Sequence, residues 1–304
     1  MKKILFGLLL LVAFGSVFAQ TPANNTLLWR ISGKNLAQPS YLFGTIHLVC
    51  ADDLELSDSL VNAIRQSERV YLELDMDNIF EMLQAVGKMK MRGDTTLADL
   101  LTPADYDRVR TFFDKKGSLV PFAVLETYKP MLAASTLMQS SFECERPVAM
   151  EQLIMQQAKK SHKKIKGLES MSYQLSIFDS IPYTVQAREL LSYIDGFESG
   201  HEGKATKEYD EMVLAYRNQQ LDKLEALVKV EEIGSEHFTD LLLYNRNANW
   251  VKKLEQLLPE AATLIAVGAG HLPGDRGIIN LLRKAGYKVE PVENNMIRKK
   301  IKEI

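Results

Sequence analysis

The sequence predicts an α/β fold, in which a mostly parallel central sheet carries flanking helices and an inserted helical block at about residues 170–258. Two observations support this prediction. Short apolar runs bounded by turn residues alternate with helical patterns at both ends of the chain. Between about Ser170 and Leu258 no strand pattern occurs, and apolar residues recur at helical spacing. We interpret the Met and Tyr residues at that spacing as core residues rather than as a cofactor-binding stripe.

Six apolar runs are predicted to form the strands of the sheet. They lie at residues 27–33, 41–47, 69–75, 164–169, 263–270 and 287–292. Helices are predicted between them at residues 58–67, 78–90, 103–117 and 121–139, and within the block at 183–197, 205–228 and 237–258. Strands separated by helices favour parallel pairing, because a parallel connection needs a crossover segment.

The first 19 residues are predicted to be a secretory signal peptide. Lys2 and Lys3 precede a short apolar run, and Val17-Phe18-Ala19 is a small-x-small cleavage site. A membrane anchor is the weaker alternative, because the run is short and is interrupted by Gly15 and Ser16. We therefore expect residues 20–304 to be a single exported domain, periplasmic or secreted, with no transmembrane segment after signal cleavage.

The charge of the chain is nearly balanced. It has 37 Lys and Arg residues against 39 Asp and Glu residues, and the loss of Lys2 and Lys3 with the signal peptide makes the balance slightly more acidic. This composition argues against nucleic acid as a partner. With 46% hydrophobic residues, the chain can bury a sizeable core.

Cys50 and Cys144 are the two cysteines of the chain. In an exported protein, an even pair suggests a disulfide, and two free buried thiols are the alternative. If they are bridged, the bond lies three residues past His47 and restrains the loop after that histidine.

The five histidines of the chain include three in the pattern Gly-x-x-His, namely His47, His237 and His271. His237 lies in a polar stretch, as do His162 and His201, and none of these three receives a role. His47 and His271 instead follow apolar runs directly, so each leaves the carboxyl end of a predicted strand. Ligands bind at that edge of open parallel sheets. The alternative for His47 is a hydrogen-bonded core residue.

A carboxylate completes the predicted ligand set. Glu73 and Asp75 end the strand VYLELD on one face, by the two-residue period. Two neutral imidazoles with a carboxylate form a common set for a divalent transition metal such as Mn, Co or Zn. We therefore predict His47, His271 and Glu73 as metal ligands, with Glu73 either a ligand or a general base. The alternative is that Glu73 pairs with an arginine at the sheet edge.

Five further features of the chain are the segments YLFGTIHL, VYLELDM, KGLESMSYQLSIF, LLLYNRNANWV and LIAVGAGHLPGDRGIINLLRKAGYKVEPV. Together they resemble the TraB/GumN family, relatives of the Tiki metalloproteases. The match spans nearly the whole mature chain, and the segments follow one another in the family's order. The resemblance implies a metal-dependent, hydrolase-like site, and peptide cleavage is known for the animal relatives.

The resemblance also implies roles for further residues. Glu169 matches the glutamate after Lys-Gly-Leu, and Arg246 and Asn247 match the helical Arg-Asn pair. Arg246 would reach a substrate carboxylate or a developing oxyanion, with a solvated helix arginine as the alternative. Glu169 would hydrogen-bond a ligand ring nitrogen. One position departs from the family pattern, because Glu151 stands where many relatives carry an aspartate.

Two functions follow from these residues. The first is an exported metal-dependent hydrolase, a peptidase with a peptide or protein substrate. The second is a non-catalytic exported protein that binds a peptide, haem or metal in the same pocket. The sequence specifies neither the substrate nor the oligomeric state.

Overall fold

The computed structural model describes residues 25–52, 54–116, 120–140, 144–198, 204–230 and 236–296. The predicted signal peptide lies outside these residues, so it stays a prediction. The described strands are β1 (Leu28–Ser32), β2 (Ser40–Thr45), β3 (Val49–Cys50), β4 (Arg69–Leu74), β5 (Pro147–Val148), β6 (Lys164–Glu169), β7 (Thr263–Gly268) and β8 (Lys288–Val292).

Six of these strands form the central sheet in the order β6-β4-β7-β2-β1-β8. The four strands β6, β4, β7 and β2 pair in parallel, whereas β1 is antiparallel to both β2 and β8. The predicted α/β class with a mostly parallel sheet is confirmed, as are all six predicted strands. The two-residue strands β3 and β5 were not predicted, because so short a segment has no hydrophobic period.

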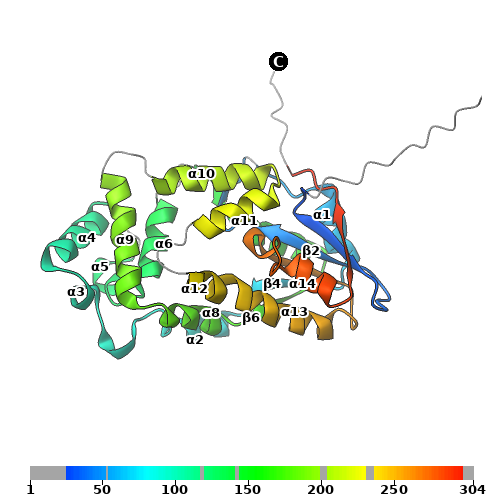
Figure 1. Cartoon of the computed structure of the whole chain (residues 1–304), viewed down its shortest axis with the longest axis horizontal. Coiled ribbons are helices and arrows are strands. Elements are labelled where there is room, and N and C mark those ends of the chain that lie inside the picture. Colours follow the sequence, from blue (N-terminus) through cyan, green and yellow to red (C-terminus); the bar gives the residue numbers. More distant parts are fainter. Residues whose placement is uncertain are drawn as a thin grey trace, which may run out of the picture.

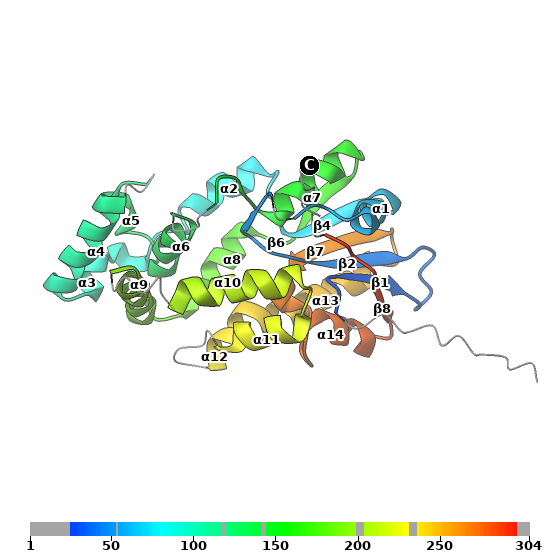
Figure 2. The same cartoon turned by 90° about the horizontal axis from the view of Figure 1, so that it is seen from above.

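Helices cover both faces of the sheet, and further helices lie beside it. Those before β7 are α1 (Asp58–Gln66), α2 (Ile79–Val86), α3 (Leu97–Leu100), α4 (Pro103–Lys116), α5 (Phe122–Leu125), α6 (Pro130–Ser140), α7 (Met150–Lys160), α8 (Met171–Ile177), α9 (Tyr183–Glu198), α10 (Lys204–Arg217), α11 (Leu221–Val230), α12 (Glu236–Thr239) and α13 (Asn245–Leu257). The helix α14 (Ile278–Lys284) follows β7. Figure 2 shows α1 and α7 on one side of the sheet, with α13 and α14 on the other.

Two predicted helices are each divided in the structure. The predicted helix at 121–139 breaks into α5 and α6 before Pro130, because proline lacks an N–H and disfavours helical geometry at the preceding residue. The predicted helix at 205–228 breaks into α10 and α11 at Gln219, whose φ of 55° is left-handed. Sequence periodicity continues across both breaks, so it could not reveal them.

A second hydrophobic core lies beside the sheet. Buried side chains of α3, α4, α5, α6 and α9 form it, among them Phe113, Leu137 and Leu190. These helices form the end of the molecule farthest from β8 in Figure 1. The helices between β6 and β7 therefore pack against two different cores. The helix α9 belongs to the second core, whereas Trp250 of α13 packs into the core around the sheet.

A buried ion pair joins the second core to α8. Lys129, which is fully buried ahead of α6, donates a hydrogen bond to the carbonyl of Leu175 in α8 at 2.7 Å. It also lies 3.0 Å from the carboxylate of Asp179 in the turn that follows. This pair fixes α8, and α8 reaches the candidate site described below.

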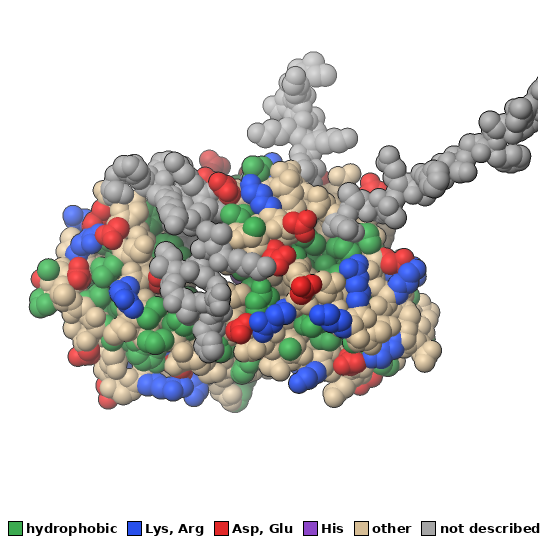
Figure 3. Space-filling view, viewed as in Figure 1, with side chains coloured by type: hydrophobic (Ala, Val, Ile, Leu, Met, Phe, Trp, Pro, Cys, Tyr) green, Lys and Arg blue, Asp and Glu red, His purple; other side chains and the backbone are tan. Residues whose placement is uncertain are grey.

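The surface shown in Figure 3 carries acidic and basic side chains that are interspersed rather than segregated. Along the described parts of the chain, we find no helix with the length and apolarity needed to cross a bilayer.

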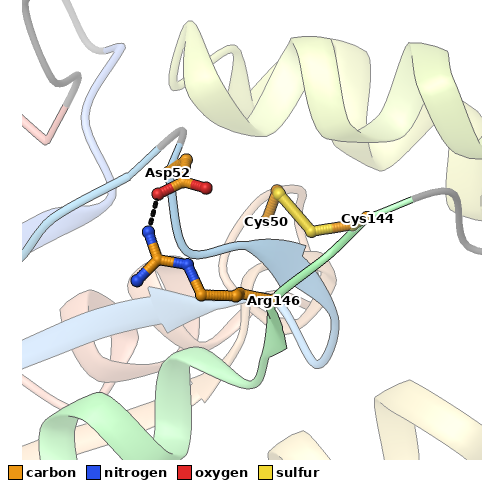
Figure 4. Close-up of a disulfide and its surroundings, with 4 residues drawn as sticks. All are labelled: Cys50, Asp52, Cys144 and Arg146. Atoms are coloured by element: carbon orange, nitrogen blue, oxygen red, sulfur yellow. Dashed lines mark hydrogen bonds and ion pairs between the residues drawn. A yellow bond between two sulfur atoms is a disulfide. The ribbon is translucent and has the colours of Figure 1, made fainter.

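A disulfide and a short ribbon tie the segment after His47 to the start of α7. Cys50 and Cys144 are bridged, with their Cα atoms 5.8 Å apart. The strands β3 and β5 pair antiparallel beside the bridge, and Arg146 forms an ion pair with Asp52 (Figure 4). The predicted disulfide is therefore present in the structure, and it closes a loop with a sequence separation of 94.

Replacing both cysteines by serine should lower the free energy of unfolding by about 2 to 4 kcal/mol, because the bridge restricts the unfolded chain. Urea unfolding of wild type and variant measures this difference. Reductant should bring the wild type to the stability of the variant and leave the variant unchanged. Mass spectrometry without reduction should find the two cysteine peptides linked, and two freely alkylated thiols in the folded protein would contradict the bridge.

Candidate functional site

The candidate site lies where three neighbouring strands end. β4, β7 and β2, the strands that lead to Glu73, His271 and His47, are adjacent and parallel. Thr45 pairs with Gly268 at the end of this ladder, so the two histidine-bearing turns start at the same level of the sheet. The parallel sheet therefore delivers all three predicted ligands to one edge.

Gly268 leaves open the space on which the three side chains converge. A β-carbon placed on it would lie 3.2 Å from Glu73 Oε1, 3.5 Å from His271 Cδ2 and 3.9 Å from His47 Nε2. The φ of Gly268 is −48°, which any residue can adopt, so the glycine is not needed for the backbone here. Its missing side chain instead provides room between the histidines and the carboxylate.

Glu73 is buried and bonded through both oxygens. Oε1 accepts a hydrogen bond from the backbone N–H of Gly268 at 2.8 Å. Oε2 accepts from Arg246 at 2.6 Å and from Gln174 of α8 at 3.3 Å. Burial alone would raise the pKa of Glu73. The positive charges of His271, which is protonated in that acidic range, of Arg246 and of His47 outweigh burial together with the Gly268 hydrogen bond, and they hold this pKa well below its usual range. Glu73 is therefore a fixed carboxylate.

Arg246 is buried, and each of its five N–H donors has an acceptor. Nε and Nη2 donate to Glu169 Oε1 at 3.0 and 2.5 Å, and Nη2 also donates to Glu73. Nη1 donates to the carbonyl of Leu242 at 2.8 Å and faces His271 Nε2 at 3.2 Å. The alternative of a solvated helix arginine is therefore wrong. Arg246 was also expected to contact a substrate. None of its N–H groups is free to do so, because the guanidinium already holds Glu73 and His271.

Arg246 follows a π-helical turn at Asp240–Tyr244, just ahead of its position in α13. Single π-helical turns occur often at functional sites, because they re-aim the side chains that follow. The Leu242 carbonyl that Arg246 binds belongs to this turn. The turn therefore sets where the guanidinium enters the site.

His271 is buried in the short turn after β7 and is oriented by Asn247. Its Nδ1 lies 2.6 Å from Asn247 Oδ1. The amide nitrogen of Asn247 donates to the carbonyls of His271 and Arg276, which assigns the amide oxygen to the histidine. Nδ1 therefore carries the hydrogen and Nε2 keeps its lone pair. Burial lowers the pKa of His271 to about 3, so the ring is neutral.

His47 differs from His271 because its side chain is 73% exposed. Its Nδ1 lies 2.8 Å from the carboxylate of Glu151, which raises the pKa of His47 to about 9. The alternative of a buried core histidine with backbone partners is therefore wrong. His47 is the solvent-facing member of the site, and Glu151 is its partner.

Glu169 does not contact either histidine ring, contrary to the expectation. Its oxygens accept from Arg246 and from the indole N–H of Trp250, the latter at 3.0 Å. Burial raises the pKa of Glu169, although Arg246 opposes this shift. Trp250 also packs against His271, with ring centroids 4.5 Å apart. The histidine rings are instead held by Asn247 and Glu151, so the predicted bond from Glu169 to a ligand ring is wrong.

Sequence reasoning assigned no role to Glu151, Gln174, Thr45 or Trp250. Glu151 stood out only as a carboxylate at a position where the family pattern differs. Gln174 and Trp250 lie inside the segments that resemble the family, which was the one available signal for them. Thr45, whose hydroxyl donates to Glu151 at 2.6 Å, lies in the segment YLFGTIHL and had the same signal.

The residues present fit a divalent cation in their chemistry. The space over Gly268 is faced by the Oε1 oxygen of Glu73 and by His47 Nε2, and His271 Nε2 lies 3.8 Å from that oxygen. The bond from Arg246 to His271 Nε2 is the contact that a cation would have to replace. Among the residues that the structure describes, no group of three His, Cys, Asp or Glu side chains is close enough together to hold a metal ion without rearrangement.

The charge balance of the cluster also favours a cation. Three carboxylates, those of Glu73, Glu151 and Glu169, face two positive groups among the described residues of the cluster: the guanidinium of Arg246 and the His47 ring, whose pKa of about 9 keeps it protonated at neutral pH. Because His271 is neutral, it does not compensate for the excess. An added positive charge therefore improves the electrostatics of this site.

Replacing Arg246 by methionine should lower the free energy of unfolding by about 3 to 5 kcal/mol, because two buried carboxylates would lose their counter-ion. Urea unfolding measures the loss. Arg276, whose pair with Asp240 is largely exposed, is the matched control, and its change to methionine should cost less than about 1 kcal/mol. The Arg246 effect should shrink in a Glu73→Gln, Glu169→Gln background. Equal costs for the two arginines would contradict this assignment.

Comparison with known proteins confirms the resemblance seen in the motifs. The model of the TraB/PrgY/gumN family matches residues 27–291. "Metalloprotease TIKI2" of Danio rerio is 22% identical over 88% of this chain and 61% of the relative. "Metalloprotease TIKI1" of Homo sapiens is 21% identical over 88% and 62%, and "Metalloprotease TIKI homolog" of Amphimedon queenslandica is 23% identical over 95% and 66%. No solved structure matches the chain significantly.

The chain spans less than two thirds of the length of these relatives, whose names describe them as metalloproteases. The family match itself runs from the first strand of the central sheet to the last, and includes every residue of the candidate site. The chain belongs to the TraB/PrgY/gumN family.

Proposed function

We propose that the chain is an exported metal-dependent hydrolase that cleaves peptide or protein substrates. The observation that carries this proposal is the convergence of His47, His271 and Glu73, from three adjacent strand ends, on the space over Gly268. The names of the relatives support the reaction class, although sequence identity to them is low.

His47, His271 and Glu73 are the residues that would hold a divalent ion such as Mn²⁺, Co²⁺ or Zn²⁺. When bound, the ion would act as a Lewis acid toward the substrate carbonyl and the attacking water. Both oxygens of Glu73 are fixed by hydrogen bonds, which favours the role of a ligand over that of a mobile proton acceptor.

The two histidines give the site an inner and an outer side. His271, Glu73 and Arg246 are buried, whereas His47 is exposed. A substrate therefore approaches from the side of His47. Arg246 acts from the buried side, where it holds the carboxylate and neutralises part of its charge rather than contacting the substrate.

The proposed location outside the cytoplasm rests on the signal-peptide pattern and on the disulfide, because disulfides persist mainly in oxidising compartments. The mass of the chain recovered from the periplasm or medium should correspond to a start at Gln20. Recovery of the uncleaved chain in the cytoplasm alone would contradict it.

Turnover tests the proposed reaction. The mature protein, supplied with Mn²⁺, Co²⁺ or Zn²⁺, should cleave members of a peptide library, and a chelator should stop cleavage until metal is restored. His47→Ala should abolish cleavage, and urea unfolding should show that the variant still folds, although the buried carboxylate of Glu151 loses its charged partner and some stability is lost with it. His162→Asn, a change of another exposed histidine, is the matched control and should retain activity. Mass spectrometry of the peptides measures cleavage.

The alternative of a non-catalytic binding protein predicts a different outcome in the same experiment. Wild type and His47→Ala would then be equally inert on every peptide, while the wild type would still bind a peptide, haem or metal. That result would refute the peptidase proposal.

Gly268→Ala tests whether the space over Gly268 is the binding space. The added methyl group fits the backbone but occupies the space that the three side chains face, so the affinity for Co²⁺ should fall roughly tenfold or more. Quenching of Trp250 fluorescence reports binding, because its ring lies against His271, and Trp29→Phe removes the other tryptophan.

Gly87→Ala is the matched control for this variant, because a β-carbon there would meet nothing within 4 Å. Both alanine variants should unfold near the wild-type temperature. Unchanged Co²⁺ affinity in Gly268→Ala would place the metal elsewhere.

A further inference from the structure

Glu151 combines burial with one satisfied and one unsatisfied oxygen. It lies in the first turn of α7 and is buried. Oε1 accepts from the Thr45 hydroxyl at 2.6 Å and lies 2.8 Å from His47 Nδ1. Oε2 is buried and has no hydrogen-bond partner in the described structure. Native proteins rarely bury a carboxylate oxygen without a partner, and such exceptions occur at functional sites.

We infer that Glu151 is the positioning residue for His47, which it fixes for cation binding. This inference rests on the proposed metal centre. The bond between Oε1 and Nδ1 leaves His47 Nε2 as the nitrogen that faces the space over Gly268, at 3.9 Å from the position of a β-carbon there. A carboxylate on the far nitrogen of a ligand histidine sets the ring orientation and increases its basicity as a ligand.

His47 needs such a partner more than His271 does. The His271 ring is buried, stacks beside Trp250 and is held by Asn247. The His47 ring is 73% exposed, so packing restrains it little and the bond to Glu151 is the polar restraint that the structure gives it. An exposed ring without a fixed partner samples several rotamers, and most of these turn Nε2 away from the site.

The backbone around this pair is itself cross-linked. His47 lies two residues before β3, and Glu151 lies three residues after β5, so the ribbon of these two strands joins them. The N–H of Met150 donates to the carbonyl of Ile46 at 3.1 Å. The disulfide closes the other end of the ribbon (Figure 4). The distance between His47 and Glu151 is therefore set by covalent and backbone bonds, as preorganisation of a ligand requires.

The carboxylates of Glu73 and Glu151 have different positions relative to the proposed metal site. Glu73 faces the space over Gly268 itself, whereas Glu151 reaches it only through the His47 ring. Removing Glu151 therefore leaves the ligand atoms in the protein and removes only the restraint on one of them. The expected result is weaker cation binding rather than none.

Metal affinity of the full mature chain tests the inference. Competition with a chromogenic chelator should give a Co²⁺ affinity about 10- to 100-fold weaker in Glu151→Ala than in the wild type. Glu151→Gln should recover part of this loss, because its amide oxygen still accepts from Nδ1–H. Gln152→Ala, an exposed neighbour on the same helix, is the matched control and should bind as the wild type does. The absorption spectrum of bound Co²⁺ reports whether the ligand geometry has changed.

Each outcome bears on the inference. Weaker binding in both Glu151 variants, with Gln152→Ala unchanged, supports it, and Glu151→Gln preserves the test if Glu151→Ala fails to fold. Wild-type affinity and an unchanged Co²⁺ spectrum in both Glu151 variants would overturn it and leave the metal centre intact. Absence of Co²⁺ binding in the wild type would overturn both. The experiment measures affinity for Co²⁺ and not cleavage. A protein that binds Co²⁺ but cleaves no peptide would therefore contradict the peptidase proposal and leave the inference about Glu151 standing.

Discussion

The rest of the site depends on one buried arrangement, in which the guanidinium of Arg246 bridges the carboxylates of Glu73 and Glu169. Two carboxylates brought together by adjacent parallel strands repel each other in a medium that screens charge poorly. Arg246, which lies in α13, offsets this repulsion by pairing with both carboxylates. The same side chain touches His271, so one residue fixes the anionic ligand and the buried neutral one. The sheet provides convergence, and the arginine makes convergence of like charges stable.

The two histidines are held by opposite means. His271 lies inside the core, and its orientation follows from packing and from an uncharged amide. His47 lies at the surface, where packing is weak, and its orientation depends on a charged partner that stands on a separate helix. A site with one buried and one exposed histidine combines rigidity with access. Substitutions on the two sides should therefore differ in kind, because changes to the buried half disturb the fold and changes to the exposed half disturb mainly the chemistry.

Much of this arrangement could be predicted from the sequence, and the reasons for the rest are physical. The strands and the edge that holds His47, Glu73 and His271 follow from apolar runs that end in Gly-x-x-His or in a carboxylate. The break before Pro130 could have been predicted from the proline itself. The break at Gln219 and the pairing of β3 with β5 do not follow, because they depend on local backbone geometry or on contacts across a long loop. The partners of the histidines are equally hidden. Asn247 is recognisable only through the family pattern. The contact between Glu151 and His47 depends on the pairing of two strands that are each only two residues long.

The bridge between Cys50 and Cys144 has a consequence for how the molecule responds to proteolytic nicking. The closed loop contains β4 with Glu73, the apolar helix α2 and most of the helices of the second core. Loop tips are the usual sites of cleavage in folded proteins. A single cut anywhere inside this loop leaves two fragments that remain covalently joined, with His47 on one and Glu151 on the other. The pair stays together across the bridge, so a nicked molecule would keep this half of the site and separate only after reduction.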